Sequence, residues 1–476
     1  MKLQTDALVL NSRVKLALEG KTFGFSCNFW RVENSCMGIS LAQMWLNHVL
    51  KKGGAPSLDL SDLYAEGTPV SNGGLSSGVV PFAKAMDGCM ASWFKPGKNS
   101  AGLLGLDITH PDLQGFLDMK LEKASKVVYL TDGEKLNNDA VQAVLAAYNN
   151  QTNLFVHKRK SREWGTNLCT EILMQHKDTC ILGTHNLDQY KDLDDFTNNF
   201  DDRYLASLEQ LIELDIELTR MYRDDYVWQL IVSDAPENKH VGLSVIGLAN
   251  LLAKCGVSYE TFVDYDAETF NLQSLIWDTL ERGISHAVDA MVDKYPEYHR
   301  LLTQAPTTNS HQYMNDINGL AVSPGINPVL GIRTRDEKGN EVVLQNVLSK
   351  DKGNRVLTYD SKVETVYDVS RHTLRKLNEM WYSMFRYTEK QQSMSYEVVI
   401  KDDETFTMDD FNTWYESELP SLYYLRKIAK VNVEAAMRLK FDSAELNLAN
   451  DFDALFEEIT ATCGISSKET DCGCNG

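Results

Sequence analysis

The sequence NLCTEI at residues 167–172 places Asn167, Cys169 and Glu171 at alternating positions. In an extended segment alternate side chains share one face, about 6 to 7 Å apart for each two-residue step. In a helix the middle residue would point away from the other two. We therefore predict that an extended loop or strand brings a hydrogen-bond donor, a sulfur atom and a potential base onto one small substrate.

On both sides of this stretch, helical segments alternate with short strand-like segments. Apolar residues recur at helical spacing over 39–51, 137–148, 204–221, 241–255 and 269–292. Short β-like runs occur at 126–130, 153–156 and 341–344. The Pro- and Gly-punctuated segment 323–340 is predicted to be a loop. Helices that alternate with short strands predict an α/β fold.

The chain of 476 residues is strongly acidic. Its 47 Lys and Arg residues and 67 Asp and Glu residues give a net charge of −20, which argues against binding of nucleic acid polymers. A nucleotide site is compatible with this charge, because backbone amides can hold phosphates. No apolar run reaches the roughly 18 residues of a membrane span. The N-terminus has an early acid and no signal-like apolar stretch, so we expect a soluble cytoplasmic protein.

The nine cysteines do not suggest a disulfide framework, because their number is odd and the chain is long without a secretory signal. A buried apolar thiol is the ordinary interpretation of any one of them. The close pair Cys472 and Cys474 lacks the second Cys or His pair of a zinc site, so we expect no metal site in this chain. Residues 462–476 are small, polar and charged, and we predict a mobile tail there.

Separate segments, taken in order, resemble the catalytic large subunits of ribonucleotide reductases. The matching segments are 26–27, 32–35, 67–78, 110–112, 167–172, 180, 186–187, 242–248, 305–312 and 422–426. Among them, 242–248 resembles a glycine-bearing helix of the family, and 305–312 resembles its phosphate loop. The agreement of order and spacing makes the resemblance specific. The short chain is similar to a compact, phage-type member of the family, and a phage-encoded protein would be located in the cytosol of the host.

The resemblance implies a fold and a domain organisation. We expect a ten-stranded α/β barrel with a central finger loop that carries Cys169. A single catalytic domain would cover residues 1–458, followed by a flexible tail over 459–476 that holds a redox cysteine pair. No N-terminal ATP cone is expected, and therefore no on–off control by ATP and dATP of the usual kind. A homodimer is expected by analogy.

The resemblance also implies reduction of ribonucleoside diphosphates to 2′-deoxyribonucleotides. Cys169 would carry the thiyl radical that removes the 3′-hydrogen, and Glu171 would accept the proton of the 3′-hydroxyl. Asn167 would orient the sugar hydroxyls. Cys27 would protonate the departing 2′-hydroxyl, and Cys27 and Cys180 would then supply two electrons and form a disulfide. That bond requires Cα atoms about 4.4 to 6.8 Å apart.

Re-reduction and substrate binding follow from the same resemblance. Cys472 and Cys474 would reopen the disulfide, with a thioredoxin- or glutaredoxin-type reductant as the outside source. Only Gly473 separates them, fewer residues than usual in the family, so their own disulfide would be strained and easily reduced. Binding of a transition metal by the tail is the alternative. Substrate contacts are expected from Ser26, Thr308, Asn309 and Ser310.

The adjacent Tyr423 and Tyr424 bear on the source of the radical. They resemble the tyrosine pair of class I enzymes, which passes a radical to the catalytic thiol, here Cys169. The radical would come from a separate, ferritin-like, metal-containing small subunit. This chain itself would then bind no cofactor. Adenosylcobalamin-dependent relatives do not need such a pair, and they are the first alternative. A catalytically silent nucleotide-binding paralogue is the second alternative, and the complete set of thiols, amide and carboxyl argues against it.

Two departures from the family pattern concern its control by effectors. In the substrate-specificity loop, Phe94 stands where the family has Gln, and Lys98 stands for an Arg, whose planar fork Lys lacks. Asn34 stands where class I enzymes often have an Asp that meets the effector ribose. A nucleoside triphosphate effector would therefore bind with altered contacts.

Four thiols match no functional position and are interpreted as structural: Cys36, Cys89, Cys255 and Cys463.

Overall fold

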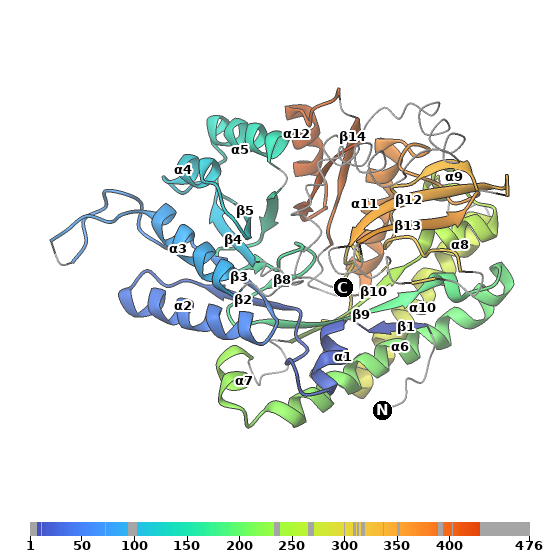
Figure 1. Cartoon of the computed structure of the whole chain (residues 1–476), viewed down its shortest axis with the longest axis horizontal. Helices are drawn as coiled ribbons and strands as arrows, with labels where there is room; N and C mark the ends of the chain where they lie inside the picture. The colour runs from blue at the N-terminus through green and yellow to red at the C-terminus, as the bar shows by residue number, and fades with distance from the viewer. Residues whose placement is uncertain are drawn as a thin grey trace.

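The central element is one large curled sheet, with helices on its outer side (Figure 1). The computed structural model describes residues 7–428, except 11, 72, 94–101, 152, 233–238, 265–270, 299, 308–310, 312–313, 316–318, 337, 350–352, 389–393 and 402. Within these residues the sheet has nine strands, in the order β1-β9-β2-β3-β4-β5-β6-β15, and β10 pairs with β9.

Five parallel strands form the first half of the sheet. They are β2 (Cys27–Arg31), β3 (Ala55–Asp59), β4 (Gly102–Asp107), β5 (Ala124–Thr131) and β6 (Leu154–Arg159). The crossovers between them are α2 (Cys36–Lys51), α3 (Val79–Ser92), α4 (Leu113–Asp118) and α5 (Asn138–Asn150). Ser35 and Asn137 begin α2 and α5 because their side chains accept backbone hydrogen bonds of the first turn. The predicted α/β class is thereby confirmed.

The second half begins with β9 (Thr179–Asn186), which runs antiparallel to β2 and parallel to β10 (Lys239–Ile246). β1 (Leu8–Leu10) pairs with β9, and β15 (Ser421–Leu422) runs antiparallel to β6. Beyond β10, single bridges join Leu243 to Leu302 and Gln304 to Met394. These pairings curl the sheet back toward β15 and β6. The ten-strand count remains a prediction.

Other elements surround this sheet. On the side of β9 and β10 lie α6 (Leu193–Tyr222), α8 (Leu248–Cys255) and α10 (Leu272–Lys294), with η1 (Leu187–Gln189) after β9. A second sheet consists of β11 (Ile332–Arg335), β12 (Glu341–Ser349) and β13 (Gly353–Asp360), and β14 (Val398–Lys401) pairs with β16 (Leu425–Ile428). The remaining helices are α1 (Ser12–Leu18), α7 (Tyr226–Ile231), α9 (Tyr259–Val263), α11 (Arg371–Thr388) and α12 (Met408–Glu416). No helix in the described part of the chain is both long and apolar enough for a bilayer.

Three predicted elements were wrong in part. The first half of the helix predicted over 241–255, which includes the supposed glycine-bearing helix 242–248, is strand β10, and α8 starts only after Gly247. A strand buried on both faces is a continuous apolar run that resembles a helix in sequence. The predicted loop 323–340 contains β11. Helix α6 also begins at Leu193, well before the predicted residue 204, because Asp192 caps it there.

Buried apolar side chains form two clusters, because alternate residues of a strand point to opposite faces. The larger cluster fills the space between the sheet and its helices. The smaller one lies on the inner face of the sheet and is called the inner cluster here. Its members are Cys27, Phe29, Ala55, Leu103, Val127, Tyr129, Phe155, Leu168, Cys169, Ile172, Met174, Cys180, Leu182 and Tyr423.

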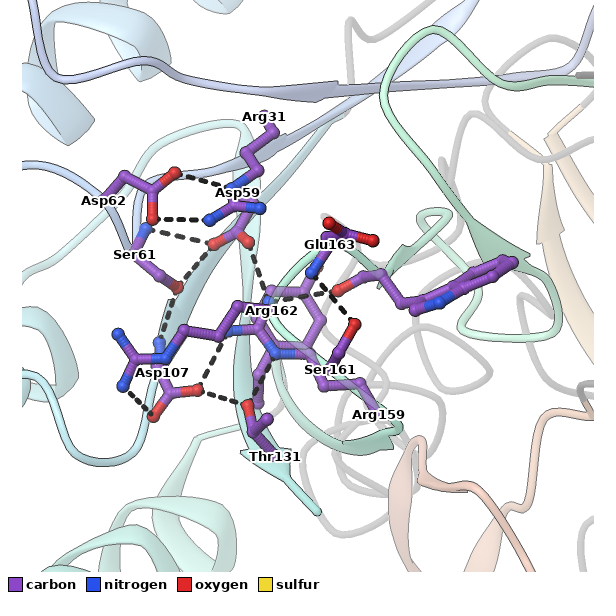
Figure 2. A network of polar contacts seen from close by, with 12 residues as sticks. Arg31, Asp59, Ser61, Asp62, Asp107, Thr131, Arg159, Ser161, Arg162 and Glu163 are labelled. Carbon is purple, nitrogen blue, oxygen red and sulfur yellow. Dashed lines mark hydrogen bonds and ion pairs between the residues drawn. The ribbon is translucent and has the colours of Figure 1, made fainter. Parts of the chain in front are cut away.

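A buried ion network joins the carboxyl ends of the parallel strands (Figure 2). Arg159, the last residue of β6, donates to Asp59 at 2.7 Å and to Asp107 at 2.9 Å, the last residues of β3 and β4. It also donates to Thr131 at the end of β5, at 2.9 Å. Burial alone would raise the pKa of Asp107, but hydrogen bonds from Thr131 and Thr109 and the charge of Arg159 lower it to about 2. Four strands are thus tied at one edge.

Replacement of Arg159 by Met should strongly destabilise the fold, because, among the described residues, Asp59 would keep a buried charge without a cation and Asp107 would retain only Arg162, at 3.9 Å. We expect the free energy of unfolding in urea to fall by about 3 to 5 kcal/mol. Arg162→Met is the matched control, since the Arg162 side chain is 43% exposed. Its pair with Glu134 and its longer pair with Asp107, at 3.9 Å, should together contribute less than about 1 kcal/mol. Equal effects of the two substitutions would contradict this assignment.

Candidate active site

The predicted catalytic stretch forms the tip of a short hairpin. The two strands of the hairpin, β7 (Gly165–Thr166) and β8 (Leu173–Met174), pair antiparallel, with residues 167–172 between them. The backbone N–H of Thr170 donates to the carbonyl of Asn167 at 3.0 Å, and Thr170 has a φ of 60°. The stretch is therefore a tight turn, and the prediction of an extended segment was wrong. A β-branched residue rarely adopts this backbone conformation, so the surroundings must impose it.

Side chains from several parts of the sheet hold the hairpin. The Ser57 hydroxyl, on β3, donates to the Thr166 carbonyl at 2.6 Å, and the Thr303 hydroxyl donates to the Glu171 carbonyl at 3.0 Å. The Ser395 hydroxyl donates to the Cys169 carbonyl, and the Thr170 hydroxyl donates to Ser421 of β15 at 3.1 Å. The turn thus has partners on both halves of the sheet. Whether it is the central loop of a closed barrel remains a prediction.

Cys27 and Cys180 face each other on neighbouring strands. Cys27 is the first residue of β2, and the antiparallel register pairs it with Cys180 of β9. Such pairs have Cα atoms about 4.5 to 5.5 Å apart, within the range of a disulfide. Both side chains are fully buried. The Asn167 amide donates to the Cys27 sulfur at 3.1 Å, which joins the hairpin to this pair.

Glu171 is a fully buried carboxyl group beside them. Neither of its side-chain oxygens accepts a hydrogen bond of good geometry from the described residues. Burial raises the pKa of Glu171 to about 7, although its own backbone amide and the Asn167 amide favour the charged form. The carboxyl group can therefore exchange a proton near neutral pH and can accept a hydrogen bond from a ligand hydroxyl.

Tyr423 and Tyr424 pack against each other, with their ring planes tilted by 50°. Their ring centroids are 4.2 Å apart, and Phe155 packs against both rings at 4.6 and 5.2 Å. Tyr423 is buried in the inner cluster together with Cys169, whereas Tyr424 is only partly buried. The guanidinium of Arg426 lies 5.4 Å from the centroid of the Tyr424 ring. Both rings thus belong to the surroundings of the inner cluster, with Tyr424 as the more accessible of the two.

The other predicted site residues are only partly covered by the structure. Ser26 is buried beside the cysteine pair, and its backbone N–H donates to the Cys180 carbonyl at 3.0 Å. The remaining predicted positions lie outside the described residues: Thr308, Asn309, Ser310, Cys472, Cys474 and the loop 94–101. No cluster of three or more His, Cys, Asp or Glu side chains suited to a metal occurs among the described residues.

Sequence reasoning did not identify His157, a buried residue of β6. The register pairs it with Tyr129 of β5 and with Ser421, the partner of Thr170. Burial and the charge of Arg159 lower the pKa of His157 to about 3, so its imidazole is neutral. Neither ring nitrogen makes a hydrogen bond of good geometry to a described residue. A single His within a strand has no local pattern that marks it, and only the pairing of strands reveals its position.

A known protein family matches the N-terminal and central parts of the chain. The model for "ribonucleotide reductase, barrel domain" matches residues 25–161 and 143–316, together more than half of the chain. Among solved structures, the class Id ribonucleotide reductase alpha subunit of Actinobacillus ureae is similar with a TM-score of 0.65. It is 16% identical, and the match covers 90% of this chain and 88% of that one. At this identity the structural match shows similarity of fold.

Curated relatives match over shorter stretches. A vitamin B12-dependent ribonucleotide reductase of Bradyrhizobium diazoefficiens is 31% identical over 111 residues, which is 22% of this chain and 9% of that protein. Another of this name, from Streptomyces clavuligerus, is 31% identical over 147 residues, covering 27% and 15%. The ribonucleoside-diphosphate reductase subunit alpha of Mycoplasma genitalium is 30% identical over 105 residues, covering 22% and 15%. This chain therefore matches at most about a sixth of the length of these relatives.

The substitution Glu171→Gln should stabilise the protein in a pH-dependent way. The folded-state pKa of about 7 lies above the unfolded value, so the stabilisation by the bound proton is complete below about pH 4.3 and is lost as the pH rises through 7. This difference in pKa between the folded and the unfolded protein corresponds to about 3 to 4 kcal/mol in the free energy of unfolding. We expect Glu171→Gln to unfold at higher urea concentration than the wild type at pH 8 but not at pH 4. The exposed Glu163→Gln is the control, and an equal effect of Glu171→Gln at both pH values would refute the buried ionisation.

Proposed function

Because this chain belongs to the ribonucleotide reductase family, we propose that it reduces ribonucleoside diphosphates to 2′-deoxyribonucleotides by thiyl-radical chemistry. The observation that carries the proposal is the meeting of the Cys27–Cys180 pair, Asn167 and the buried carboxyl of Glu171 at the hairpin that bears Cys169. The diphosphate substrate is supported by the name of the Mycoplasma genitalium relative.

The first half of the reaction uses the hairpin. A thiyl radical on Cys169 removes the 3′-hydrogen of the ribose and becomes a thiol. Glu171 accepts the proton of the 3′-hydroxyl, for which it must be ionised, and the pKa of about 7 places this change near neutral pH. Asn167 can orient a sugar hydroxyl while its amide remains near Cys27. The carboxyl oxygens of Glu171 would thereby gain the hydrogen-bond donor that the described residues do not provide.

The second half uses the cysteine pair. Cys27 protonates the 2′-hydroxyl, which leaves as water, and the two thiols together supply two electrons. A disulfide forms between Cys27 and Cys180, and C2′ gains a hydrogen. Glu171 returns the proton to the 3′-oxygen, and the Cys169 thiol returns the hydrogen to C3′, which regenerates the thiyl radical. In sum, one C–OH group and two thiols become one C–H group, one water and one disulfide. Because the pair already lies in register, bond formation requires only small movements of the side chains.

The radical source in this proposal is a separate, ferritin-like, metal-containing subunit. The adjacent rings of Tyr423 and Tyr424 support it, because their centroids are 4.2 Å apart, Tyr423 lies in the cluster of Cys169 and Tyr424 packs against that cluster while being only partly buried. Adenosylcobalamin as the radical source is the second candidate, favoured by the names of the Bradyrhizobium and Streptomyces relatives.

Several finer features belong to the same proposal. They are the closed ten-stranded barrel with a central finger loop, one catalytic domain over 1–458, and a tail over 459–476 whose Cys472 and Cys474 exchange with the disulfide. A homodimer, a nucleoside triphosphate effector, and a thioredoxin- or glutaredoxin-type reductant complete it. The catalytic set Cys27, Asn167, Cys169, Glu171 and Cys180 argues against a catalytically silent paralogue.

Turnover of CDP with dithiothreitol tests the proposed reaction. Parallel reactions contain a radical-generating small subunit, adenosylcobalamin, or neither, and formation of deoxycytidine diphosphate is measured. We expect product only in the reaction with the small subunit. Cys169→Ser should lower the rate of product formation at least 100-fold, because a serine hydroxyl cannot replace the thiyl radical. The exposed thiol variant Cys36→Ser should retain activity. Normal turnover by Cys169→Ser would refute the thiyl assignment.

The variant Tyr423→Phe separates the two radical sources. With the small subunit as source, loss of the phenol should abolish turnover, because a phenylalanine ring cannot be oxidised at the potential of a tyrosine. With adenosylcobalamin as source, the same variant should keep most of its activity. The partly exposed Tyr415→Phe of α12 is the control for loss of a phenol elsewhere. Full activity of Tyr423→Phe with the small subunit would exclude the relay.

A further inference from the structure

We propose that His240 accepts the proton of the Cys180 thiol during disulfide formation and supplies a proton to Cys180 when the disulfide is reopened. This inference rests on the proposed function and adds a proton acceptor to its redox pair. The parallel register of β9 and β10 places His240 directly beside Cys180, which in turn faces Cys27 on β2. The three residues form one row across three neighbouring strands, and all of them are buried.

His240 and Cys180 point to the same, inner face of the sheet. Val241, Leu243 and Val245 of β10 belong to the outer apolar cluster, so the alternate residues face inward. The space around Gly242 confirms this, because a Cβ atom there would lie 2.9 Å from Leu182, a member of the inner cluster. Neighbouring strands are about 4.8 Å apart, so the imidazole and the sulfur are neighbours on this face, and a small side-chain rotation can bring them into contact.

One hydrogen bond determines the tautomer of His240. Its Nε2 lies 3.0 Å from the backbone carbonyl oxygen of Leu302. A carbonyl oxygen can only accept, so Nε2 carries the hydrogen, and Nδ1 of the neutral ring holds the lone pair. Leu302 lies on the far side of β10 from β9, and the two nitrogens of an imidazole point in widely different directions. The basic nitrogen is therefore directed away from Leu302.

The nearby carboxyl groups are less suited to this proton transfer. Asp178 lies two residues before Cys180, but its Oδ2 accepts from Arg300 at 2.6 Å and from the backbone N–H of Gln175 at 2.7 Å. Glu171 is required for the 3′-hydroxyl in the proposed reaction. A neutral imidazole is an effective base near neutral pH, where an ordinary thiol is mostly protonated.

The transfer balances within the proposed reaction. The thiol proton of Cys180 passes to Nδ1 of His240, and the resulting thiolate bonds to the sulfur of Cys27. His240 then releases this proton, which becomes the new hydrogen on C2′. The two electrons for the new C–H bond come from the two thiols. When an external dithiol reduces the disulfide, it supplies two electrons and two protons, and His240 passes one of these protons to the departing Cys180 thiolate.

The test uses the full-length chain and the reopening of the disulfide, which requires neither a radical nor a nucleotide. Protein oxidised with diamide is first examined by mass spectrometry for a Cys27–Cys180 disulfide. Its reduction by dithiothreitol is then followed by alkylation of the released thiols. His240→Gln keeps a donor for the Leu302 carbonyl but has no basic nitrogen, so we expect its reduction to be slower by on the order of 100-fold.

Two further variants separate proton transfer from packing. In His240→Ala, added imidazole should restore the rate, whereas pyrazole, which has the same shape but is a much weaker base, should not. His185→Gln is the matched control, since this buried His of β9 bonds to Ser207 and Tyr190 and packs in the outer cluster. We expect it to reduce at the wild-type rate.

The outcomes distinguish this inference from the proposed function. If no Cys27–Cys180 disulfide forms in the wild type, the proposed function fails first. If the disulfide forms and His240→Gln is reduced as fast as the wild type, His240 is not the proton acceptor. Equal rescue of His240→Ala by imidazole and pyrazole would likewise overturn the inference, because it would show that only the volume of the ring matters.

Discussion

The antiparallel pairing of β2 with β9 is the constraint on which the site depends. It joins the parallel first half of the sheet to the second half, and it places Cys27 opposite Cys180 although 153 residues separate them in sequence. A shift of this register by one residue would turn one sulfur to the outer face of the sheet. Both strands are buried on both faces, so such a shift would also expose apolar surface or bury polar groups. The fold therefore fixes the geometry of the thiol pair more strongly than any local contact.

The ion network at the opposite edge complements this constraint. It ties the ends of β3 to β6, and Arg159 also donates to the carbonyl of Trp164 at 3.1 Å, just before the hairpin begins. The hairpin is thus anchored at its base by charge and at its tip by the hydroxyls of Thr303, Ser395 and Ser421. An anchored hairpin can keep Thr170 in an unfavourable backbone conformation, because many contacts would be lost if the turn relaxed.

The sequence predicted the α/β class and most helices and strands, because their periodicity is a local property. It also identified Cys27, Asn167, Cys169, Glu171 and Cys180 as one set, through the order and spacing of family-like segments. It could not predict that residues 167–172 form a turn, since hydroxyls distant in sequence hold that turn. It failed at β10 because a strand buried on both faces has the apolar pattern of a helix. His157 and His240 have no local pattern, and only strand register shows that they face the inner side.

The inner face of the sheet combines polar groups with an apolar cluster, and in the proposed reaction this combination serves chemistry rather than stability. Burial makes the charged form of Glu171 unfavourable and brings its pKa to about 7, where a general base is most effective. The same burial keeps the thiols away from water and from unspecific oxidation. A carboxyl group in such a place lowers the stability of the folded protein at neutral pH, and the network of Arg159 and the packed outer cluster offset that loss. In the proposed reaction, the chain therefore gives up stability at this site for the ability to move protons and electrons between fixed groups.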